Sequence, residues 1–433
     1  MEEELILTKD TVKLKTEQLN KLLNLSFRKE GGIVEKGKDG YILTIPDYQR
    51  IYSWEEKQVI SLLDDLTCYT NKPFHLGSII FHKKQDQACY SIVDGQQRIV
   101  TLSLLLLHLK PDIDISILSA TFQSEEAQNY IAYNKWVIKN YCDTNELLNQ
   151  KLGDILENVQ FSVLIIEDGS LDLAYTFFSN QNSRGKSLTD FELLKAHHLR
   201  YVHVQEQAEH LASRWDSIIL SSGNDDSKDL LRNLFEIYLF RLRKWMRKRE
   251  WSNNQKFKVK TEFEAAPIII DIPPFGEQFN FYETIQGGAH FFAYADQFIY
   301  KYKIFADTFA YRLLNKYLSD ENHWWYRDIV EAFLYAYYLK FNTLYLADAL
   351  SGIIDLVSNH RFDAGRAHLK SLFKFAGETE IIMMIDQATS PTFFLAELRS
   401  KTKLLPTPSG LTGTRFRYKA AIKKIKDNVL LIS

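Results

Sequence analysis

The sequence predicts an α+β protein in which an α/β domain over residues 1–205 is followed by a mostly α-helical domain over residues 206–433. Three observations support this prediction. A chain of 433 residues exceeds what one hydrophobic core usually supports. Short β-rich runs alternate with helical patterns in the first half, as at Leu76–His82 and Val159–Glu167. Beyond about residue 206, Leu, Phe and Tyr recur at helical spacing with few β-branched runs.

The first domain is expected to contain, in order, a short amphipathic helix over 9–25, a strand over 41–45, a helix over 53–66 capped by Ser53, a hairpin of strands 76–82 and 90–93, a helix over 99–109, a strand over 159–167, a helix over 171–180, and a helix over 189–200 capped by Thr189. In the second half, polar residues 221–229 are the expected linker, and the proline-containing segment 251–289 is a long excursion between helices.

Composition excludes several classes of protein. The 45% hydrophobic and 25% charged fractions are typical of soluble globular proteins. The acidic amino terminus lacks the basic start and apolar core of a signal peptide, and the densest apolar run, Leu102–Leu109, is too short to span a bilayer. Three cysteines without a CxxC pair exclude a disulfide framework and a zinc ribbon. We therefore expect a cytoplasmic protein with reduced thiols.

The net charge of −2 means that any contact with nucleic acid must come from local patches. Two runs are candidates, and a solvated helix face is the alternative for each. The first run contains Arg241, Arg243, Lys244, Arg247, Lys248 and Arg249, and the second contains Arg415, Arg417, Lys419, Lys423, Lys424 and Lys426.

The most specific local signal is the sequence Asp94-Gly95-Gln96-Gln97-Arg98, between a strand and a helix. A glycine turn at a helix amino terminus offers free backbone N–H groups and a positive dipole end, which favour anions. The guanidinium of Arg98 suits phosphate oxygens, Asp94 can hold a divalent cation, and glutamines can position an attacking water. An ordinary aspartate-glycine turn with a surface arginine is the alternative.

Two further polar clusters flank this motif in the sequence. In residues 46–54, Arg50 lies among aromatic residues, where Tyr52 or Trp54 could stack on a base, although such aromatics more often pin a helix to a core. Residues 182–190 form a basic glycine-containing loop before a capped helix, but they lack the upstream glycine of a Walker A motif. The alternative interpretation of residues 182–190 is a solvated loop.

Taken together, these clusters resemble a known family. The order is Tyr48-Gln49-Arg50, then Leu76-Gly77-Ser78, then DGQQR at 94–98, then Asn182 with Arg184-Gly185-Lys186, and finally Leu193-Leu194-Lys195. Over roughly residues 10–205 the chain resembles the amino-terminal domain of GmrSD-type, modification-dependent (Type IV) restriction enzymes. One departure is that Ile99-Val100-Thr101 carries one threonine where the family often has two.

The resemblance implies a ParB/sulfiredoxin-like α/β core that binds and hydrolyses a nucleoside triphosphate with a divalent cation, Mg²⁺ or Ca²⁺, and that acts on DNA, including modified phage DNA. It implies catalytic roles for Asp94, Gln96, Gln97 and Arg98, with Asp94 as the weak metal ligand. The implied nucleotide-binding residues are Arg50, Gly95, Arg98, Thr101, Asn182, Gly185 and Lys186. Asp190 and Lys195 match positions that brace the loop.

Many relatives also carry an HNH nuclease domain at the carboxyl end, and its motif is not found in this sequence. His290, His323, His360 and His368 are scattered, without the arrangement suited to such a site. We therefore expect an NTPase subunit of a DNA restriction and anti-phage system whose nuclease is a separate polypeptide. The rival hypothesis is a non-catalytic protein that binds a nucleotide or DNA as a scaffold or sensor. A third, lower-ranked possibility is that the ParB-like core is itself a nuclease.

Overall fold

The computed structural model describes residues 12–28, 33–68, 73–83, 88–119, 125–167, 173, 189–202, 204–221, 228–248, 259–264, 279–319, 322–363, 368–403 and 409–431. The chain divides into two compact units, Met1–Leu220 and Ser221–Ser433. The sequence-based boundary at residues 205 and 206 precedes the helix α9 (Gln205–Ser221), nearly all of which is part of the first unit.

A five-stranded mixed sheet forms the centre of the first unit, in the order β1-β7-β5-β6-β4. Its strands are β1 (Val12–Gln18), β4 (Leu43–Thr44), β5 (Phe74–His82), β6 (Tyr90–Asp94) and β7 (Val159–Ile166). The predicted hairpin is confirmed, because β5 and β6 pair antiparallel. β5 also pairs parallel to β7, and this pairing is interrupted between His75 and Ser78. A separate ribbon joins β2 (Leu25–Arg28) to β3 (Ile33–Lys36).

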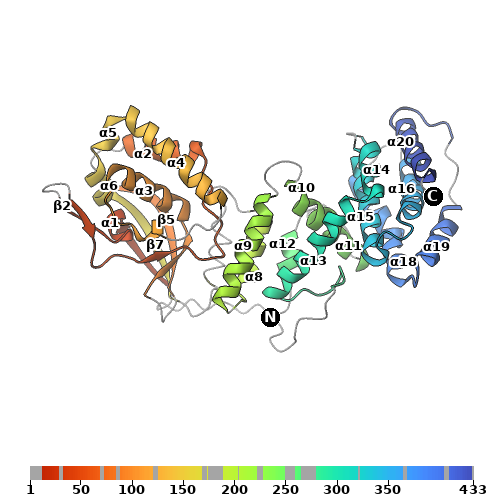
Figure 1. The fold of residues 1–433 in the computed structure, drawn as a ribbon, viewed down its shortest axis with the longest axis horizontal. Coiled ribbons are helices and arrows are strands. Elements are labelled where there is room, and N and C mark those ends of the chain that lie inside the picture. The colour runs from red at the N-terminus through yellow and green to blue at the C-terminus, as the bar shows by residue number, and fades with distance from the viewer. Residues whose placement is uncertain are drawn as a thin grey trace. The chain divides into compact units, whose positions relative to one another are not determined.

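Alternating side chains divide between the two faces of this sheet. Ile79 and Phe81 of β5 enter the larger core, whereas Ile80 between them enters a smaller core on the opposite face. Figure 1 shows several helices of this unit stacked on one side of the sheet. They include α2 (Glu56–Cys68), α3 (Gln96–Leu109), α4 (Glu125–Thr144) and α6 (Leu152–Asn158), beside the short α1 (Leu19–Leu22), η1 (Ser116–Ser119) and α5 (Glu146–Asn149). On the other face, α8 (Asp190–Leu199) contributes Ala196 and Leu193.

Several local predictions are confirmed. The helix expected after the glycine turn is α3, and the strand expected over 159–167 is β7. Thr189 caps α8 through a complete capping box, in which its hydroxyl accepts from the Glu192 N–H and the Glu192 carboxylate accepts from the Thr189 N–H. The helix predicted over 171–180 and the loop that follows lie outside the described residues, except for Leu173.

Two local predictions are wrong. Residues 12–18 form the edge strand β1 and only Leu19–Leu22 are helical, because β7 supplies a pairing partner that overrides the amphipathic pattern. Ser53 does not cap α2, which begins at Glu56. Instead the Ser53 N–H donates to the side chain of Gln97. The helices α4 to α6 between α3 and β7 were not predicted.

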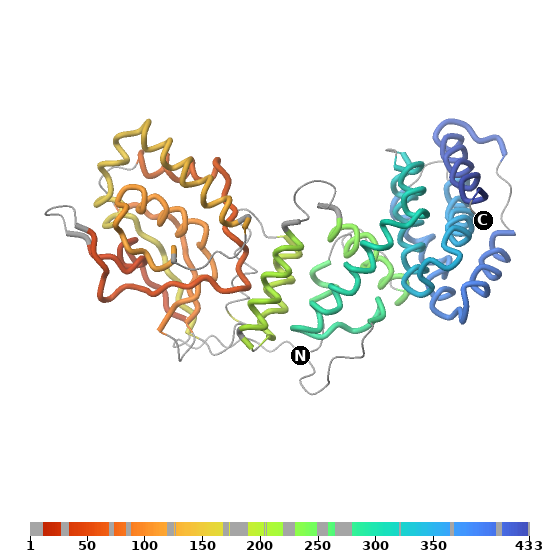
Figure 2. The backbone as a smooth tube through the Cα atoms, in the orientation of Figure 1, coloured from red at the N-terminus to blue at the C-terminus, as the bar shows by residue number. Residues whose placement is uncertain are grey.

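All secondary-structure elements described in the second unit are helices. Its elements are α10 (Lys228–Leu231), the π-helix η2 (Arg232–Leu239), α11 (Phe240–Met246), α12 (Val259–Glu264), α13 (Ala289–Ala306), α14 (Phe309–Leu318), α15 (Trp324–Phe341), α16 (Leu346–Asp363), α17 (Leu369–Glu378), α18 (Ile381–Gln387), α19 (Pro391–Lys403) and α20 (Gly413–Leu430). Figure 2 traces these helices in green through blue. The predicted fold class, α+β followed by a helical region, is therefore confirmed.

The core of the second unit is rich in aromatic rings. Tyr335 of α15 packs against Tyr238, Tyr302 and Phe305, with ring centroids 5.2 to 6.0 Å apart. Such contacts carry the tyrosine hydroxyls into the interior, where each requires a hydrogen-bond partner. Among the helices of the described residues, none is long and apolar enough to cross a membrane.

Candidate functional site

The turn between β6 and α3 requires glycine for two independent reasons. Gly95 has φ +97°, in the left-handed region that side chains disfavour, and it precedes the first residue of α3. A Cβ at this position would lie 2.8 Å from Cγ1 of Ile79. The turn therefore brings the amino terminus of α3 directly against β5.

Arg98, on the first turn of α3, is directed back onto the irregular part of β5. Its Nη1 donates to the Leu76 carbonyl at 2.7 Å and its Nη2 to the Ser78 carbonyl at 2.6 Å. Gly77 between them has φ +101°, and a Cβ there would lie 2.6 Å from Nη1. Burial lowers the pKa of Arg98, an effect that the nearby Asp94 carboxylate opposes. Two donors of the guanidinium are thus bound to the backbone.

Gln97 holds the segment that contains Arg50. Its Oε1 accepts from the Ser53 N–H at 2.9 Å, and its Nε2 donates to the Ile51 carbonyl at 3.1 Å. Both ends of the amide are therefore bound to one stretch of backbone. In this arrangement Gln97 shapes the loop beside the helix terminus.

Gln96 differs sharply from its neighbour. Its side chain is 4% exposed, yet its Oε1 has no hydrogen-bond partner among the residues that the structure describes. The first backbone bond of α3 runs from the Ile99 N–H to the Gly95 carbonyl, so the amides of the preceding first turn have no partner within the helix. A buried polar atom without a partner costs about 1–3 kcal/mol, which makes this position a candidate ligand contact.

Charged side chains gather beside this helix terminus. Burial lowers the pKa of Arg50, while the carboxylates of Glu192 and Asp94 act on it in the opposite direction. The fold therefore brings Arg50, Asp94 and Glu192 within electrostatic range of one another, although they belong to three separate segments. Asp94 Oδ2 also lies 3.9 Å from Arg98 Nη2, and the Asp94 side chain is 38% exposed.

A buried lysine fixes the segment before Arg50. Lys195 of α8 is fully buried, and its Nζ donates to the Gln49 carbonyl at 2.7 Å and to Asp216 Oδ1 of α9 at 2.8 Å. The Gln49 side chain in turn donates to the Ile92 and Val93 carbonyls of β6. Lys195 therefore braces the Gln49 segment, whereas the loop that it and Asp190 were expected to brace lies outside the described residues.

Tyr52 and Thr101 lie in the core. Tyr52 is fully buried, and its hydroxyl lies 2.8 Å from Thr101 Oγ1 and accepts from Asn134 Nδ2 at 3.0 Å. Thr101 is also fully buried and donates to the Gln97 carbonyl. The structure therefore favours the alternative in which Tyr52 pins its segment to the core. The burial of Thr101 in the same core argues against the nucleotide contact expected for it. Asn182, Gly185 and Lys186 lie outside the described residues.

The first basic run is largely interior, which corrects the expectation of an exposed patch. Arg241, Arg243 and Lys244 are each at most 6% exposed. Arg243 pairs with Glu262 at 2.7 Å and donates to the Phe281 and Glu283 carbonyls. The Arg247 and Lys248 side chains pair with Glu262 and Glu380. The buried charges of this helix therefore serve internal contacts, whereas the Lys248–Glu380 pair is more than half exposed and Arg249 lies outside the described residues.

The second basic run has a different environment. Arg417 and Lys423 of α20 are exposed, whereas Arg415 donates to the Phe362 carbonyl at 3.1 Å. Lys424 lies 6.0 Å from the ring of Tyr317 on α14. The exposed positions on α20 remain available as a cationic surface.

The described residues offer no ready-made cluster of metal ligands. Among the described residues there is no group of three or more His, Cys, Asp or Glu side chains that could hold a metal ion. Mg²⁺ commonly takes one or two protein carboxylates together with phosphate oxygens and water. Asp94, which is partly exposed beside Arg50, fits that minimal role.

Sequence reasoning missed Glu192, Asp216 and Asn134. Glu192 was visible as the third residue after the capping Thr189, but its charge contact with Arg50 depends on how α8 crosses the sheet. The pairing of Lys195 with Asp216 also joins different helices. No local pattern in the sequence indicates either contact.

Two families match parts of this chain. Residues 31–199 match the GmrSD restriction endonuclease, N-terminal domain family, and residues 269–409 match DUF7834, a family of unknown function. No curated protein matches the chain. The first match encloses the β6–α3 turn, the Arg50 segment and all of α8, in agreement with the resemblance carried by the motifs. Residues 31–199 are therefore similar to the GmrSD restriction endonuclease, N-terminal domain family.

Proposed function

We propose that this protein is a nucleoside-triphosphate-hydrolysing subunit of a bacterial DNA restriction and anti-phage system. The match of residues 31–199 to the GmrSD restriction endonuclease, N-terminal domain family supports the restriction-system part of this proposal. The observation that carries the nucleotide assignment is the amino terminus of α3, where three features coincide. They are the left-handed Gly95, the buried Gln96 Oε1 that has no hydrogen-bond partner within the described residues, and the nearby Arg50.

Each residue has a distinct part in this proposal. The first-turn amides of α3 bind phosphate oxygens, aided by the positive end of the helix dipole. Arg50 supplies positive charge, and Gln96 hydrogen-bonds either to the nucleotide or to the attacking water. Arg98 and Gln97 act mainly through the backbone that they hold, because their bonds run to β5 and to the Ile51–Ser53 segment.

A divalent cation, Mg²⁺ or Ca²⁺, enters with the nucleotide in this proposal. Asp94 is the residue that would hold it, with phosphate oxygens completing its ligands. The cation would neutralise the negative charge of the phosphates. The part of this chain is to place Asp94 beside Arg50 and the helix terminus.

A non-catalytic nucleotide-binding or DNA-binding scaffold is the second candidate. It is favoured by the fact that Gln97 and Arg98, two of the predicted catalytic side chains, are bound to the backbone. In that case Arg50, Asp94 and the amino terminus of α3 bind a nucleotide as a switch without turnover.

Phosphate release from each ribonucleoside triphosphate, with Mg²⁺ or Ca²⁺ and with or without DNA, separates the two candidates. The wild type is compared with Asp94→Asn and Gln96→Met, which change the proposed contacts, and with Glu397→Gln, which alters an exposed acid of α19. We expect turnover in the wild type and in Glu397→Gln. We expect about a hundredfold loss in Asp94→Asn, in the range for removing a catalytic group.

A folded protein that binds nucleotide but releases no phosphate under any of these conditions would establish the scaffold reading. A folded protein that shows no turnover and binds neither a nucleotide nor DNA would refute both candidates. Circular dichroism of each variant provides the check that loss of activity is not loss of folding.

We further propose that DNA is contacted through exposed cations of α20, and that cleavage belongs to a separate polypeptide. His290 accepts a hydrogen bond from the Gln286 N–H, and His360 hydrogen-bonds with Tyr326 and Ser371. These two histidines serve structural contacts in different places, which supports the proposal that cleavage belongs to a separate polypeptide. If α20 contacts phosphates, Arg417→Gln with Lys423→Gln should weaken DNA binding and lower its salt dependence by about two phosphate contacts.

A further inference from the structure

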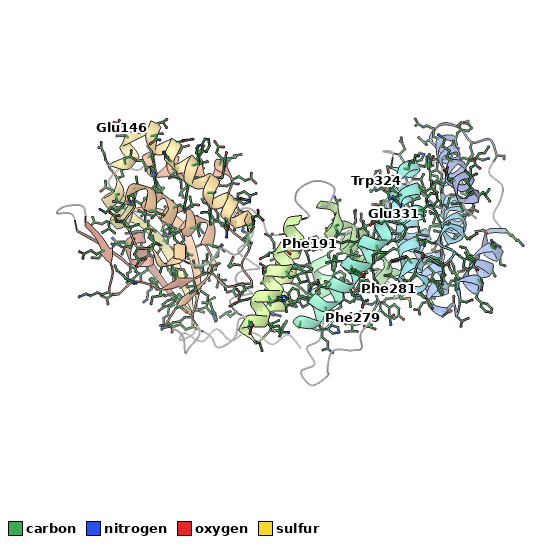
Figure 3. The ribbon with its side chains drawn as sticks, in the orientation of Figure 1. Glu146, Phe191, Phe279, Phe281, Trp324 and Glu331 are labelled. Carbon is green, nitrogen blue, oxygen red and sulfur yellow. The ribbon has the colours of Figure 1, made fainter. Side chains whose placement is uncertain are left out.

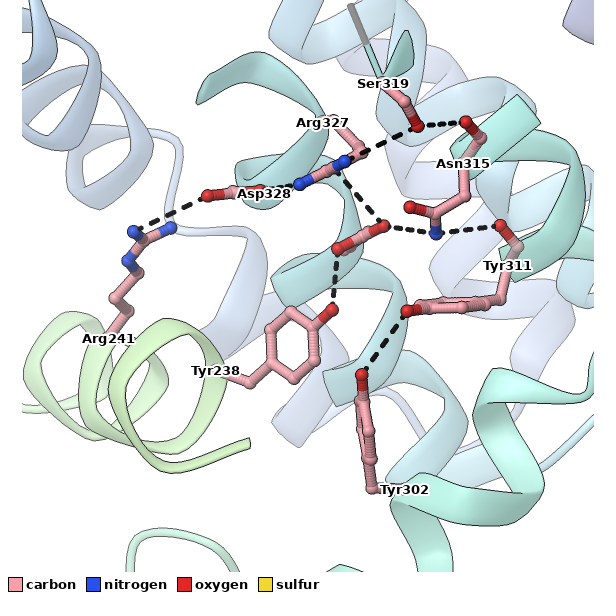
Figure 4. Close-up of polar contacts among 9 residues, drawn as sticks. Tyr238, Arg241, Tyr302, Tyr311, Asn315, Ser319, Arg327 and Asp328 are labelled. Carbon is pink, nitrogen blue, oxygen red and sulfur yellow. Dashed lines mark hydrogen bonds and ion pairs between the residues drawn. The ribbon is translucent and has the colours of Figure 1, made fainter. Parts of the chain in front are cut away.

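A network of charged and polar side chains is buried in the second unit around Glu331 of α15. Glu331 is 3% exposed and lies among closely packed side chains (Figure 3). Its Oε2 accepts from Tyr238 of η2 at 2.6 Å, and its Oε1 accepts from Asn315 of α14 at 2.6 Å. Figure 4 shows these contacts converging from neighbouring helices.

Arginines balance the two buried acids of α15 incompletely. Arg327 Nε lies 3.7 Å from Glu331 Oε1, while its Nη2 donates to Asp328 at 3.0 Å. Arg241 of α11 lies 3.9 Å from the other oxygen of Asp328. Because Arg327 bonds directly to Asp328 and stands farther from Glu331, the Glu331 carboxylate depends on its two neutral donors.

The helix that supplies Tyr238 is unusual. Residues 232–239 form a π-helix of eight residues, continuous with α10 before it and α11 after it. Most π-helical segments are single wide turns within an α-helix, and they persist only where tertiary contacts hold them. Tyr238 is such a contact, because its hydroxyl bonds to Glu331 and its ring packs on Tyr302 and Tyr335.

We propose that Glu331 and η2 form a proton-sensitive conformational switch, in which the ionised carboxylate holds the wide helical turns through Tyr238 and the protonated carboxyl releases them toward an α-helix. A hydrogen bond to a charged acceptor is stronger than one to a neutral acceptor. Taking up a proton from solvent therefore weakens the bond from Tyr238 without removing either side chain.

The charge environment makes this step accessible near neutral pH. Burial raises the pKa of Glu331 to about 7, and the opposing effect of Arg327 is smaller. Burial also keeps Tyr238 protonated, because it raises the tyrosine pKa well above its ordinary value. The titratable or charged groups that interact with Glu331 are Tyr238 from η2, Arg241 from α11, Tyr302 from α13, Tyr311 from α14, and Arg327 and Asp328 from α15 itself.

Groups on the other helices packed against α15 pair elsewhere. His360 of α16 bonds to Tyr326, Asp386 of α18 accepts from Tyr282, and Glu378 of α17 pairs with Lys374. Each residue removed from the wide turns rotates the following helix by about 100°. The switch would therefore also displace Arg241 from Asp328, which carries the change into α11.

Amide hydrogen exchange of the full chain tests the switch. Rates for residues 232–240, corrected for the intrinsic pH effect, are compared at about pH 6 and about pH 8, on either side of the Glu331 titration. We expect exchange at least about fivefold faster at the lower pH in the wild type, because 232–240 opens more readily once Tyr238 is released. This local opening leaves Glu331 buried, so it is separate from the free energy of global unfolding, to which a proton on Glu331 contributes stability. Glu331→Gln should exchange fast at both values.

Glu378→Gln, which changes an exposed acid of α17, is the matched control and should behave as the wild type. An identical pH response in the wild type and in Glu331→Gln would overturn the proposal, as would protection of 232–240 that is independent of pH. If Glu331→Gln does not fold, Tyr238→Phe removes the donor and leaves the acid. Retention of the wild-type pH response in Tyr238→Phe would equally overturn the switch.

Discussion

The two units bury polar side chains in different ways. Around the amino terminus of α3, the long polar side chains bind backbone, as Arg98 does on β5, Gln97 on the Ile51–Ser53 segment and Lys195 on Gln49. Around Glu331, polar side chains bind one another across η2, α14 and α15. The first arrangement fixes the shape of a loop, whereas the second couples the protonation of one group to the positions of others.

This difference changes how the DGQQR motif should be interpreted. Its five residues do not share one role, because Gly95 allows the turn, Gln97 and Arg98 hold neighbouring backbone, and Asp94 and Gln96 are the two to which we assign the proposed chemistry. A motif that resembles a catalytic set can thus consist largely of residues that build the site. Substitutions at residues that hold the backbone and at residues assigned to the proposed chemistry should therefore have different effects, and the predictions below test this.

The largest effect is expected at Lys195. Replacing it with Met leaves Asp216, whose side chain is 18% exposed, without its cation and leaves the Gln49 carbonyl without a donor. Breaking a buried ion pair from one side costs about 4 kcal/mol, so the urea midpoint of the first unit should fall markedly. The double variant Lys195→Met with Asp216→Leu should recover most of the loss. A single variant within about 1 kcal/mol of the wild type would contradict the bracing role.

The first unit also shows what the sequence could and could not predict. The hairpin, the glycine turn, α3 and the Thr189 cap depend on residues adjacent in the chain, and all were predicted correctly. β1 was read as helix, because its strand state depends on pairing with β7 about 150 residues away, a separation set by the fold.

In the second unit, the basic run near Arg243 was read as a surface because spacing alone does not reveal burial. The Glu331 network was not anticipated at all. Its bond to Tyr238 joins residues 93 positions apart, so no window of sequence contains both partners. Contacts of this kind arise from helix packing, and only the arrangement of α14, α15 and η2 brings them together.

The next largest effect concerns pH and Glu331. Its folded pKa of about 7 lies above the ordinary value of 4.5, so the folded state binds the extra proton between these values. Its contribution to stability is therefore fully present below about pH 4.5 and is lost as pH rises through 7, by about 3 kcal/mol. Compared with Glu331→Gln by chemical denaturation, the wild type should lose this amount over that window. Parallel pH profiles for the two proteins would show that Glu331 is not titrating in the interior.

The smallest effects are expected at the adjacent glutamines Gln96 and Gln97, where a structural role can be separated from a ligand contact. Gln97→Met removes two hydrogen bonds to the Ile51–Ser53 backbone and should cost about 2 kcal/mol. Gln96→Met removes a buried oxygen that has no partner among the described residues, so unfolding should change by less than about 0.5 kcal/mol. Nucleotide affinity, measured by calorimetry, should nevertheless fall in Gln96→Met. Equal destabilisation in both variants would mean that Gln96 is also part of the scaffold, and the ligand contact would then have to come from Arg50 and the helix amides alone.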